Sequence, residues 1–350
     1  MAMAGQGVGK GEGAGAKSLR TQYVKYIAAL LLFGTNGLVA SRIVLDSMQT
    51  TFMRTLLGGA LMAVLALTMR TLRRRESGRR DLKGGQNDSA QRARMATAAR
   101  DIAFVAVSGM CMGISWMFQY EAFQHVGVGV TSLVYCIGPV IVLALSPLLF
   151  GERFVPARTV WFAVALAGVL LVNGGSDGSV ENGGEGDAFG MFCAVMCAVA
   201  YAAMVAFNKR ARSLSGIDNS TVQLISAFAT TAMCCGALGR LPFEIPATSV
   251  GPTLLLGLVN TGIGCYLYFS AINVLPAQSV AVCDYIEPIG ATVLAGIFLG
   301  ETLAPVQAAG AALVVCGALG SELVGRGLAG RMRERTTRER AGCERAERQR

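Results

Sequence analysis

The chain has 350 residues, of which 53% are hydrophobic and only 15% are charged, yet its formal net charge is +9. Soluble domains carry roughly 25% charged residues and disordered chains have low hydrophobicity, so this composition argues against both classes. A basic chain often binds nucleic acid, but that interpretation fails if the basic residues mark loops between membrane spans.

Ten apolar stretches approach the length of roughly 20 residues that a membrane-spanning helix needs. The first half of the chain holds five of them, at residues 24–44, 48–69, 102–120, 128–150 and 160–172. The second half holds five more, at residues 188–207, 222–238, 250–274, 279–299 and 304–324. The sequence therefore predicts an all-α integral membrane protein with about ten transmembrane helices.

Hydrophilic segments divide these stretches into larger units. Residues 1–22 form an N-terminal tail, rich in Gly and Ala, without the apolar core of a signal peptide. We expect a first half at 23–173 with a basic loop at 70–100, an outer loop at 174–187, a second half at 188–325 and a charged tail at 326–350. The loop at 70–100 and the tail are expected to be disordered or loosely helical.

The basic residues predict the orientation, because Lys and Arg accumulate in cytoplasmic loops. With ten spans and a cytoplasmic N-terminus, 28 of the 31 Lys and Arg fall on the cytoplasmic side. Arg42 and Arg240 fall outside, and Arg54 falls within the second span. We therefore expect a multi-pass protein of the cytoplasmic membrane with both termini in the cytoplasm. The positive charge then reports orientation, and we expect a lipid bilayer and no nucleic acid as partner.

The two halves of the chain resemble each other. A gapless shift of 149 residues aligns Pro139 with Pro288 and Gly151-Glu152 with Gly300-Glu301. Because each half holds an odd number of spans, the second half enters the membrane in the opposite direction. The prediction is two inverted five-helix repeats, an arrangement that is common in secondary transporters, whose substrate sites lie near the midplane between the halves.

These motifs resemble those of the EamA family of the drug/metabolite transporter superfamily, over residues 26–319. The resemblance rests on Arg54 early in the second span, on the Pro and Gly-Glu pattern above, and on Tyr268-Phe269-Ser270-Ala271 followed by Asp284 and Glu287-Pro288. It implies ten helices around a central cavity lined mainly by helices one, three, four, six, eight and nine. It also implies movement of small metabolites, often the export of amino acids or related solutes.

Two acidic residues stand out, because a charge inside a span costs about 2.5–3.5 kcal/mol at the helix centre. Asp284 and Glu287 are three residues apart and share a helix face, and Pro288 frees a backbone carbonyl one turn back. Either Asp284 takes part in proton coupling or amine binding, or both carboxylates anchor the packing of helices. Glu287 belongs to the Glu-Pro pair of the fold pattern, so we favour a structural role for it, with ion coupling beside Asp284 as the alternative. Asp284 replaces Tyr135 of the first half and is the functional candidate.

Other side chains are candidates for the cavity or for gating. Arg54 has the geometry to bind a substrate carboxylate, but we favour a structural role in which it reaches the membrane interface or pairs with Asp46. Pro139 and Pro288 are structural or gating positions. Aromatic and amide groups can bind a zwitterion, and the candidates are Asn36, Trp116, Tyr120, Tyr135, Tyr201, Asn260 and Tyr266. The alternative for each is packing or a place in the interfacial belt.

Several kinds of chemistry find no support in the sequence. His125 is the only histidine, the ten Cys are scattered, and no phosphate-binding loop occurs, so we expect no metal, no cofactor and no ATP-driven step. The prediction is a secondary transporter for small metabolites such as amino acids, acting by alternating access with export favoured, as a monomer or homodimer, coupled to protons or to no ion. The alternatives are a multidrug or lipid-like carrier and a membrane enzyme or receptor.

Overall fold

The computed structural model describes residues 9–77, 88–142, 185–241 apart from 212 and 215, 244–275 apart from 273, and 283–301, with scattered positions at 160–171 and 304–324. Every regular element in this part of the chain is helical. The α-helices are α1 (Gly9–Gly34), α2 (Asn36–Ala40), α3 (Ser47–Ser77), α4 (Asp88–Tyr135), α7 (Glu185–Arg210), α8 (Gly216–Ala237), α9 (Ala247–Leu254), α10 (Gly264–Ala271) and α12 (Ile286–Leu294). Two further stretches, η1 (Leu255–Ile263) and η2 (Ala295–Leu299), are π-helical.

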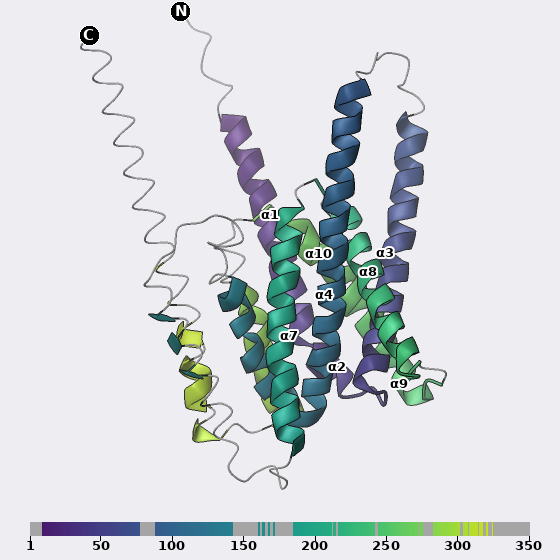
Figure 1. Ribbon diagram of the computed structural model, residues 1–350. Coiled ribbons are helices and arrows are strands. Elements are labelled where there is room, and N and C mark those ends of the chain that lie inside the picture. The colour runs from purple at the N-terminus through teal and green to yellow at the C-terminus, as the bar shows by residue number, and fades with distance from the viewer. Residues whose placement is uncertain are drawn as a thin grey trace, which may run out of the picture.

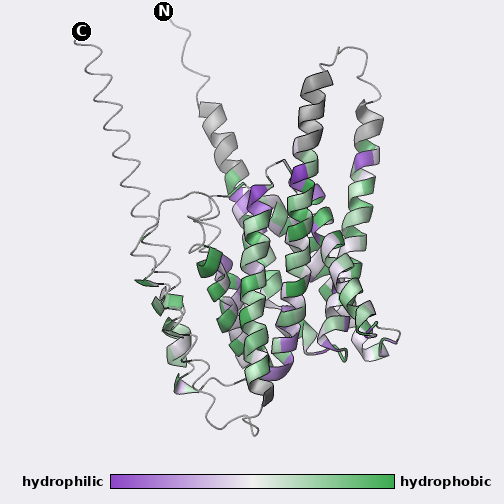
Figure 2. Ribbon diagram, viewed as in Figure 1, coloured by the Kyte–Doolittle hydropathy of each residue, from purple (hydrophilic) through white to green (hydrophobic). Residues whose placement is uncertain are grey.

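Six helical stretches in the described residues are long and apolar enough to cross a membrane. They are Leu19–Ala40, Ser47–Leu72, Thr97–Val142, Ala188–Arg210, Gly216–Ala237 and Ala247–Ala271. Hydrophobic residues cover the middle of the bundle, and hydrophilic ones gather toward its ends (Figure 2). Within the described residues, the prediction of an all-helical chain with several helices able to span a membrane is therefore confirmed. Ten spans and an inverted repeat stay predictions, because residues 143–159 and 276–282 and parts of 160–172 and 304–324 lie outside the described part.

The longest stretch, within α4, reverses direction at Gly127, whose φ of 80° and ψ of 168° are not helical. Contacts along α7 show the reversal: they pair Ser108 with Met204, Ser115 with Cys197, and then Gly138 with Tyr201. The segment before Gly127 is thus antiparallel to α7 and the segment after it is parallel. The two segments correspond to two of the expected spans, 102–120 and 128–150.

The reversal at Gly127 is held by Glu301, which follows η2. The Glu301 carboxylate accepts hydrogen bonds from the backbone N–H groups of Val128 (3.0 Å) and Gly129 (2.7 Å). These N–H groups begin a helical segment and have no partner within it, so Glu301 acts as a cap supplied from a distant part of the chain. This contact joins α4 to the end of η2.

Three helices extend past the rest of the bundle at one end, where α1 begins, α3 ends and α4 begins (Figure 1). The helix expected at 48–69 continues to Ser77, and the one expected at 102 already begins at Asp88. Much of the basic loop expected at 70–100 is therefore helical. Arg, Leu and Ala are good helix formers, so a helix can continue from the apolar span into water.

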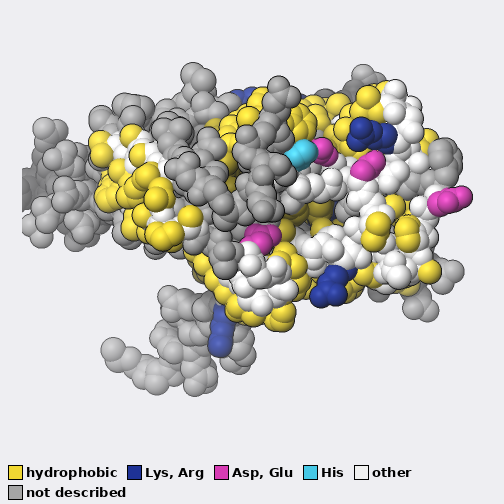
Figure 3. Space-filling view, turned by 90° about the horizontal axis from the view of Figure 1, so that it is seen from below, with side chains coloured by type: hydrophobic (Ala, Val, Ile, Leu, Met, Phe, Trp, Pro, Cys, Tyr) yellow, Lys and Arg dark blue, Asp and Glu magenta, His cyan; other side chains and the backbone are white. Residues whose placement is uncertain are grey.

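Charged contacts also gather at this end. Arg70 forms a salt bridge with Asp218 at 3.0 Å, and Asp101 accepts a hydrogen bond from the Ser213 backbone at 2.9 Å. Few basic side chains are seen on the opposite end (Figure 3). There His125 lies 3.5 Å from Glu121, which also accepts a hydrogen bond from Ser47. The structure thus separates two chemically different ends of the bundle, and the assignment of either end to the cytoplasm stays a prediction.

Small residues allow the helices of the core to approach closely. A Cβ added at Gly109 would lie 2.3 Å from the Gln223 carbonyl oxygen, and one added at Gly113 would lie 2.9 Å from that of Ala227. Such contacts between small residues are typical of helix packing in membranes. They bring α4 and α8 together beside the main cluster of buried hydrophobic residues, to which α1, α7, α8 and α10 contribute.

Candidate functional site

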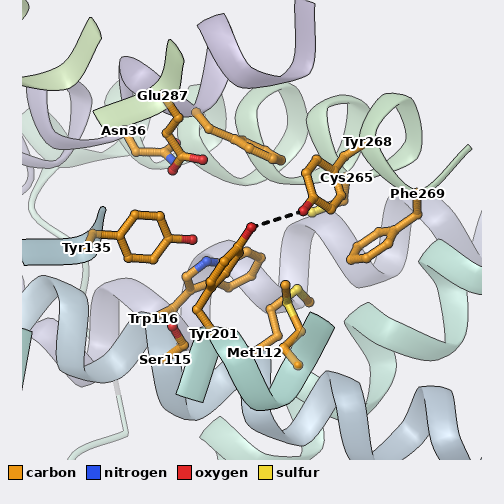
Figure 4. A pocket seen from close by; sticks show the side chains of 12 residues that line it. Asn36, Met112, Ser115, Trp116, Tyr135, Tyr201, Cys265, Tyr268, Phe269 and Glu287 are labelled. Carbon is orange, nitrogen blue, oxygen red and sulfur yellow. Dashed lines mark hydrogen bonds between the residues drawn. The ribbon is translucent and has the colours of Figure 1, made fainter. Parts of the chain in front are cut away.

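A cavity lies among these helices, and twelve described residues line it (Figure 4). The lining residues come from both halves of the chain: Phe33, Asn36, Met112, Ser115, Trp116, Tyr135, Tyr201, Met204, Cys265, Tyr268, Phe269 and Glu287. The cavity is thus formed by α1, α2, α4, α7, α10 and α12, and no single helix would produce it.

Tyrosine rings form much of the cavity wall. The rings of Tyr135 and Tyr201 are 4.9 Å apart between centroids, and those of Tyr26 and Tyr268 stack at 5.1 Å. The hydroxyl oxygens of Tyr201 and Tyr268 are 3.4 Å apart, the contact dashed in Figure 4. Tyrosine combines an apolar ring with a polar hydroxyl, so this wall offers both stacking surfaces and hydrogen-bonding groups.

Asp284, the functional candidate from the sequence, lies behind this wall. Its side chain accepts hydrogen bonds from the hydroxyls of Tyr26 and Tyr201, the latter at 3.1 Å. The residue is 9% exposed and does not line the cavity. Its carboxylate joins the segment before α12 to α1 and α7, and both of its oxygens have a tyrosine partner.

Glu287, which the sequence assigned a structural role, lines the cavity instead. It lies in the first turn of α12, and Figure 4 shows its side chain beside Asn36, facing the tyrosine wall. Within the described residues, its carboxylate takes part in no hydrogen bond or salt bridge. Glu287 is also the one charged residue among the described lining residues. The two carboxylates, one turn apart, therefore have very different surroundings.

Arg54 is fully buried against the outer side of this site. Its Nε donates to the Thr261 hydroxyl at 2.9 Å and its Nη1 to the Tyr120 hydroxyl at 2.5 Å. Its guanidinium carbon lies 3.9 Å from the ring centroid of Trp116, which lines the cavity. The second terminal nitrogen, Nη2, is buried without a hydrogen-bond partner among the described residues. Arg54 thus neither reaches the membrane interface nor pairs with Asp46, the two structural contacts that we weighed for it.

Two irregular backbone segments meet beside the cavity. The first is the break between α1 and α2 at Thr35, and the second is η1. Asn260 of η1 donates from its amide nitrogen to the Leu32 carbonyl, the Thr35 hydroxyl and the Asn36 side chain at 2.9–3.0 Å. Such π-helical segments are frequent at functional sites. Asn260 does not line the cavity itself, but it holds the lining residue Asn36 in place.

The remaining predicted residues fall into two groups. Asn36, Trp116, Tyr135 and Tyr201 line the cavity, whereas Tyr120, Asn260 and Tyr266 lie around it. Pro288 is buried inside α12, and Pro139 is half-buried in the returning segment after Gly127. Within the described residues, no group of three or more His, Cys, Asp or Glu side chains has an arrangement that could hold a metal ion.

Sequence reasoning missed seven lining residues, and a helical pattern could have found some of them. On α4, Met112 and Ser115 lie four and one residues before Trp116, and on α7, Met204 lies three residues after Tyr201. On α10, Cys265, Tyr268 and Phe269 share the same spacing. Residues three or four apart lie on one helix face. Extending the predicted aromatic residues Trp116, Tyr201 and Tyr266 along their faces recovers Met112, Met204 and Phe269 respectively. The same rule does not recover Ser115, Cys265 and Tyr268.

A bundle of apolar helices around a mixed aromatic and polar cavity defines a multi-pass membrane protein with a candidate site for a small molecule. The family model described as the EamA-like transporter family matches residues 22–174 and 188–322. The chain therefore belongs to this family, as the sequence motifs suggested.

Individual relatives of the chain are also described as transporters. An uncharacterized transporter of Bacillus subtilis, YxxF, is 24% identical over 81% of this chain and 84% of its own length. A probable terminal-alkyne amino-acid exporter of Streptantibioticus cattleyicolor is 26% identical over 68% of this chain and 78% of its own length. The fold also matches one crystal structure, whose chain is 21% identical to this one. The match covers 88% of this chain and 98% of the other, with a TM-score of 0.59. The relatives share the class of membrane transporters, and the solved structure shares the fold.

Proposed function

We propose that this protein is a secondary carrier that moves small metabolites, amino acids foremost, across the cytoplasmic membrane, with export as its physiological direction. The observation that carries the proposal is the cavity, which combines six aromatic side chains with hydroxyl, amide and carboxylate groups inside an apolar bundle. The relative described as a probable amino-acid exporter supports this class of substrate.

Alternating access is the proposed mechanism. Two features support movement around the cavity: the broken helix α1–α2 and the π-helical η1, which meet at Asn260. Broken helices line the substrate sites of many secondary transporters built from inverted repeats. We infer that the two halves rock against each other and that the contact of Glu301 with Val128 and Gly129 closes one end.

The proposed orientation places both termini in the cytoplasm. It is supported by the end of the bundle that carries Arg70, Arg100, Lys209 and Arg210, because basic residues favour the cytoplasmic side. Asp284 and Glu287 are the proposed groups for proton coupling, since they are the acidic residues at the level of the cavity. A carrier without ion coupling would transport equally well in the absence of a pH gradient.

A multidrug or lipid-like carrier is the second candidate, because half of the described lining residues are aromatic. Such substrates need apolar surface and few directional hydrogen bonds. The Glu287 carboxylate, which has no hydrogen-bond partner among the described residues, would then be costly to desolvate without compensation. This cost favours a small polar substrate.

Counterflow in proteoliposomes tests the proposal. Vesicles that contain the purified protein are loaded with one unlabelled amino acid at millimolar concentration, and the entry of traces of the labelled form is followed with and without a pH gradient. We expect transient accumulation for at least one amino acid that protein-free vesicles do not show. Absence of accumulation across amino acids, sugars and lipophilic cations, with folded protein, would contradict a carrier.

A further inference from the structure

We propose that the cavity recognises its substrate through a protonated amino group, which binds the Glu287 carboxylate against the surrounding tyrosine and tryptophan rings. The proposal rests on the proposed function, since it names the chemical class of ligand for the same cavity. It moves the ligand-binding role from Asp284, which the sequence favoured, to Glu287.

The first argument is the state of the Glu287 carboxylate. It lines the cavity, it is the single charged group among the described lining residues, and no described residue gives it a hydrogen bond or salt bridge. An acidic group in an apolar bundle is costly unless a counter-charge or hydrogen-bond donors compensate it. A ligand ammonium group supplies both the charge and the donors.

The second argument is the contrast with Asp284. Its two oxygens already accept hydrogen bonds from Tyr26 and Tyr201, and it does not line the cavity. A ligand amine would have to break these bonds to reach it. Asp284 therefore positions the tyrosines, and Glu287 faces the ligand.

The third argument is the aromatic surroundings. Trp116, Tyr135, Tyr201 and Tyr268 line the same cavity as Glu287 (Figure 4). A cation within about 6 Å of an aromatic ring centre is attracted by the negative face of the ring. A carboxylate combined with several rings thus favours an ammonium group over an uncharged one, and it disfavours an organic anion.

Arg54 supplies a positive charge near Glu287, but it does not line the cavity. Its guanidinium lies against Trp116 outside the set of lining residues, and two of its nitrogens are held by Thr261 and Tyr120. The described lining residues therefore include an anion and no cation. A substrate with an amino group gains charge complementarity, whereas a substrate with only a carboxylate meets repulsion from Glu287.

Three matched probes test the proposal: leucine, 3-methylbutylamine, which lacks the carboxylate, and 4-methylpentanoate, which lacks the amino group. Binding to the purified full chain in detergent is measured by isothermal titration calorimetry. We expect leucine and the amine to bind and the acid not to bind. Glu287→Gln should weaken binding of both amines by about tenfold or more, because a charge-assisted contact is lost.

Glu121→Gln is the matched control, since it makes the same change on α4 outside the cavity and should leave amine binding unchanged. Size-exclusion chromatography establishes that each variant is folded. If Glu287→Gln does not fold, Glu287→Asp takes its place, with weaker amine binding and the same preference for amines expected.

Three results would overturn the proposal: binding of 4-methylpentanoate as tight as that of the amines, no binding of either amine, or full amine binding by Glu287→Gln. Loss of binding in Asp284→Asn with retention in Glu287→Gln would place the amine at Asp284 and would overturn it equally. Counterflow of a solute without an amino group would leave the carrier function standing and refute the amine site. Amine binding without flux of any solute would refute the carrier function alone.

Discussion

Arg54 shows how a single buried charge is accommodated inside the bundle. The planar guanidinium stacks on Trp116 and directs two of its nitrogens to the hydroxyls of Thr261 and Tyr120. These contacts connect α3, α4 and η1 behind the cavity. Because the contacts depend on a flat group with several fixed donors, lysine cannot reproduce them.

We predict that Arg54→Lys lowers the free energy of unfolding by about 1–3 kcal/mol, since it leaves buried hydroxyl groups with poorer partners. Thermal unfolding of the detergent-solubilised protein, followed by tryptophan fluorescence, measures the change. Arg70→Lys is the control: Arg70 is 66% exposed, and its salt bridge contributes little, so the melting temperature should not change. Equal stability of Arg54→Lys and the unmodified chain would show that these contacts are not important for the fold.

Some of the residues that line the cavity could be predicted from the sequence. Trp116, Tyr135, Tyr201 and Asn36 were predictable, because aromatic and amide groups are unusual enough in apolar spans to draw attention. The different surroundings of Asp284 and Glu287 were not predictable. Their spacing placed them on one face, but only the tertiary positions of Tyr26 and Tyr201 show which carboxylate is bonded and which faces the cavity.

The helix break at Gly127 was predicted only in part by the spacing of apolar residues. The apolar pattern predicted a break between residues 120 and 128. It did not predict the positive φ of Gly127 or the cap from Glu301, because these depend on a chain segment more than 170 residues away. The π-helical η1 was likewise hidden, since residues 250–274 look like one uniform apolar span.

Gly127→Ala should lower the free energy of unfolding by at least about 1–2 kcal/mol, because a side chain disfavours positive φ. The new Cβ would also lie 3.2 Å from both oxygens of Glu301, which are needed for the cap. Gly236→Ala serves as the control: its helical backbone and open surroundings should make it neutral or slightly stabilising. Chemical denaturation in mixed micelles compares the two variants. A Gly127→Ala chain as stable as Gly236→Ala would contradict the proposed turn.

The whole molecule joins distant segments around one cavity. Residues of α1 and α2 meet residues of α10 and α12, and α4 and α7 complete the wall. The class of fold was predictable from the length and number of apolar stretches and from the placement of charges. The cavity was not, because it forms only where helices from distant parts of the chain pack together.

Two-sided labelling of Cys265 most directly tests the central claim that this cavity is a transport pathway. Cys265 lines the cavity and is 1% exposed, so it can react only when the cavity opens. A variant that keeps Cys265 and has the other cysteines replaced by alanine is placed in vesicles, with its Cys265→Ala counterpart as control. A membrane-impermeant quaternary ammonium methanethiosulfonate is applied from outside or trapped inside. We predict modification from either side, slowed by leucine. Modification from one side only, or none in a folded chain, would contradict alternating access.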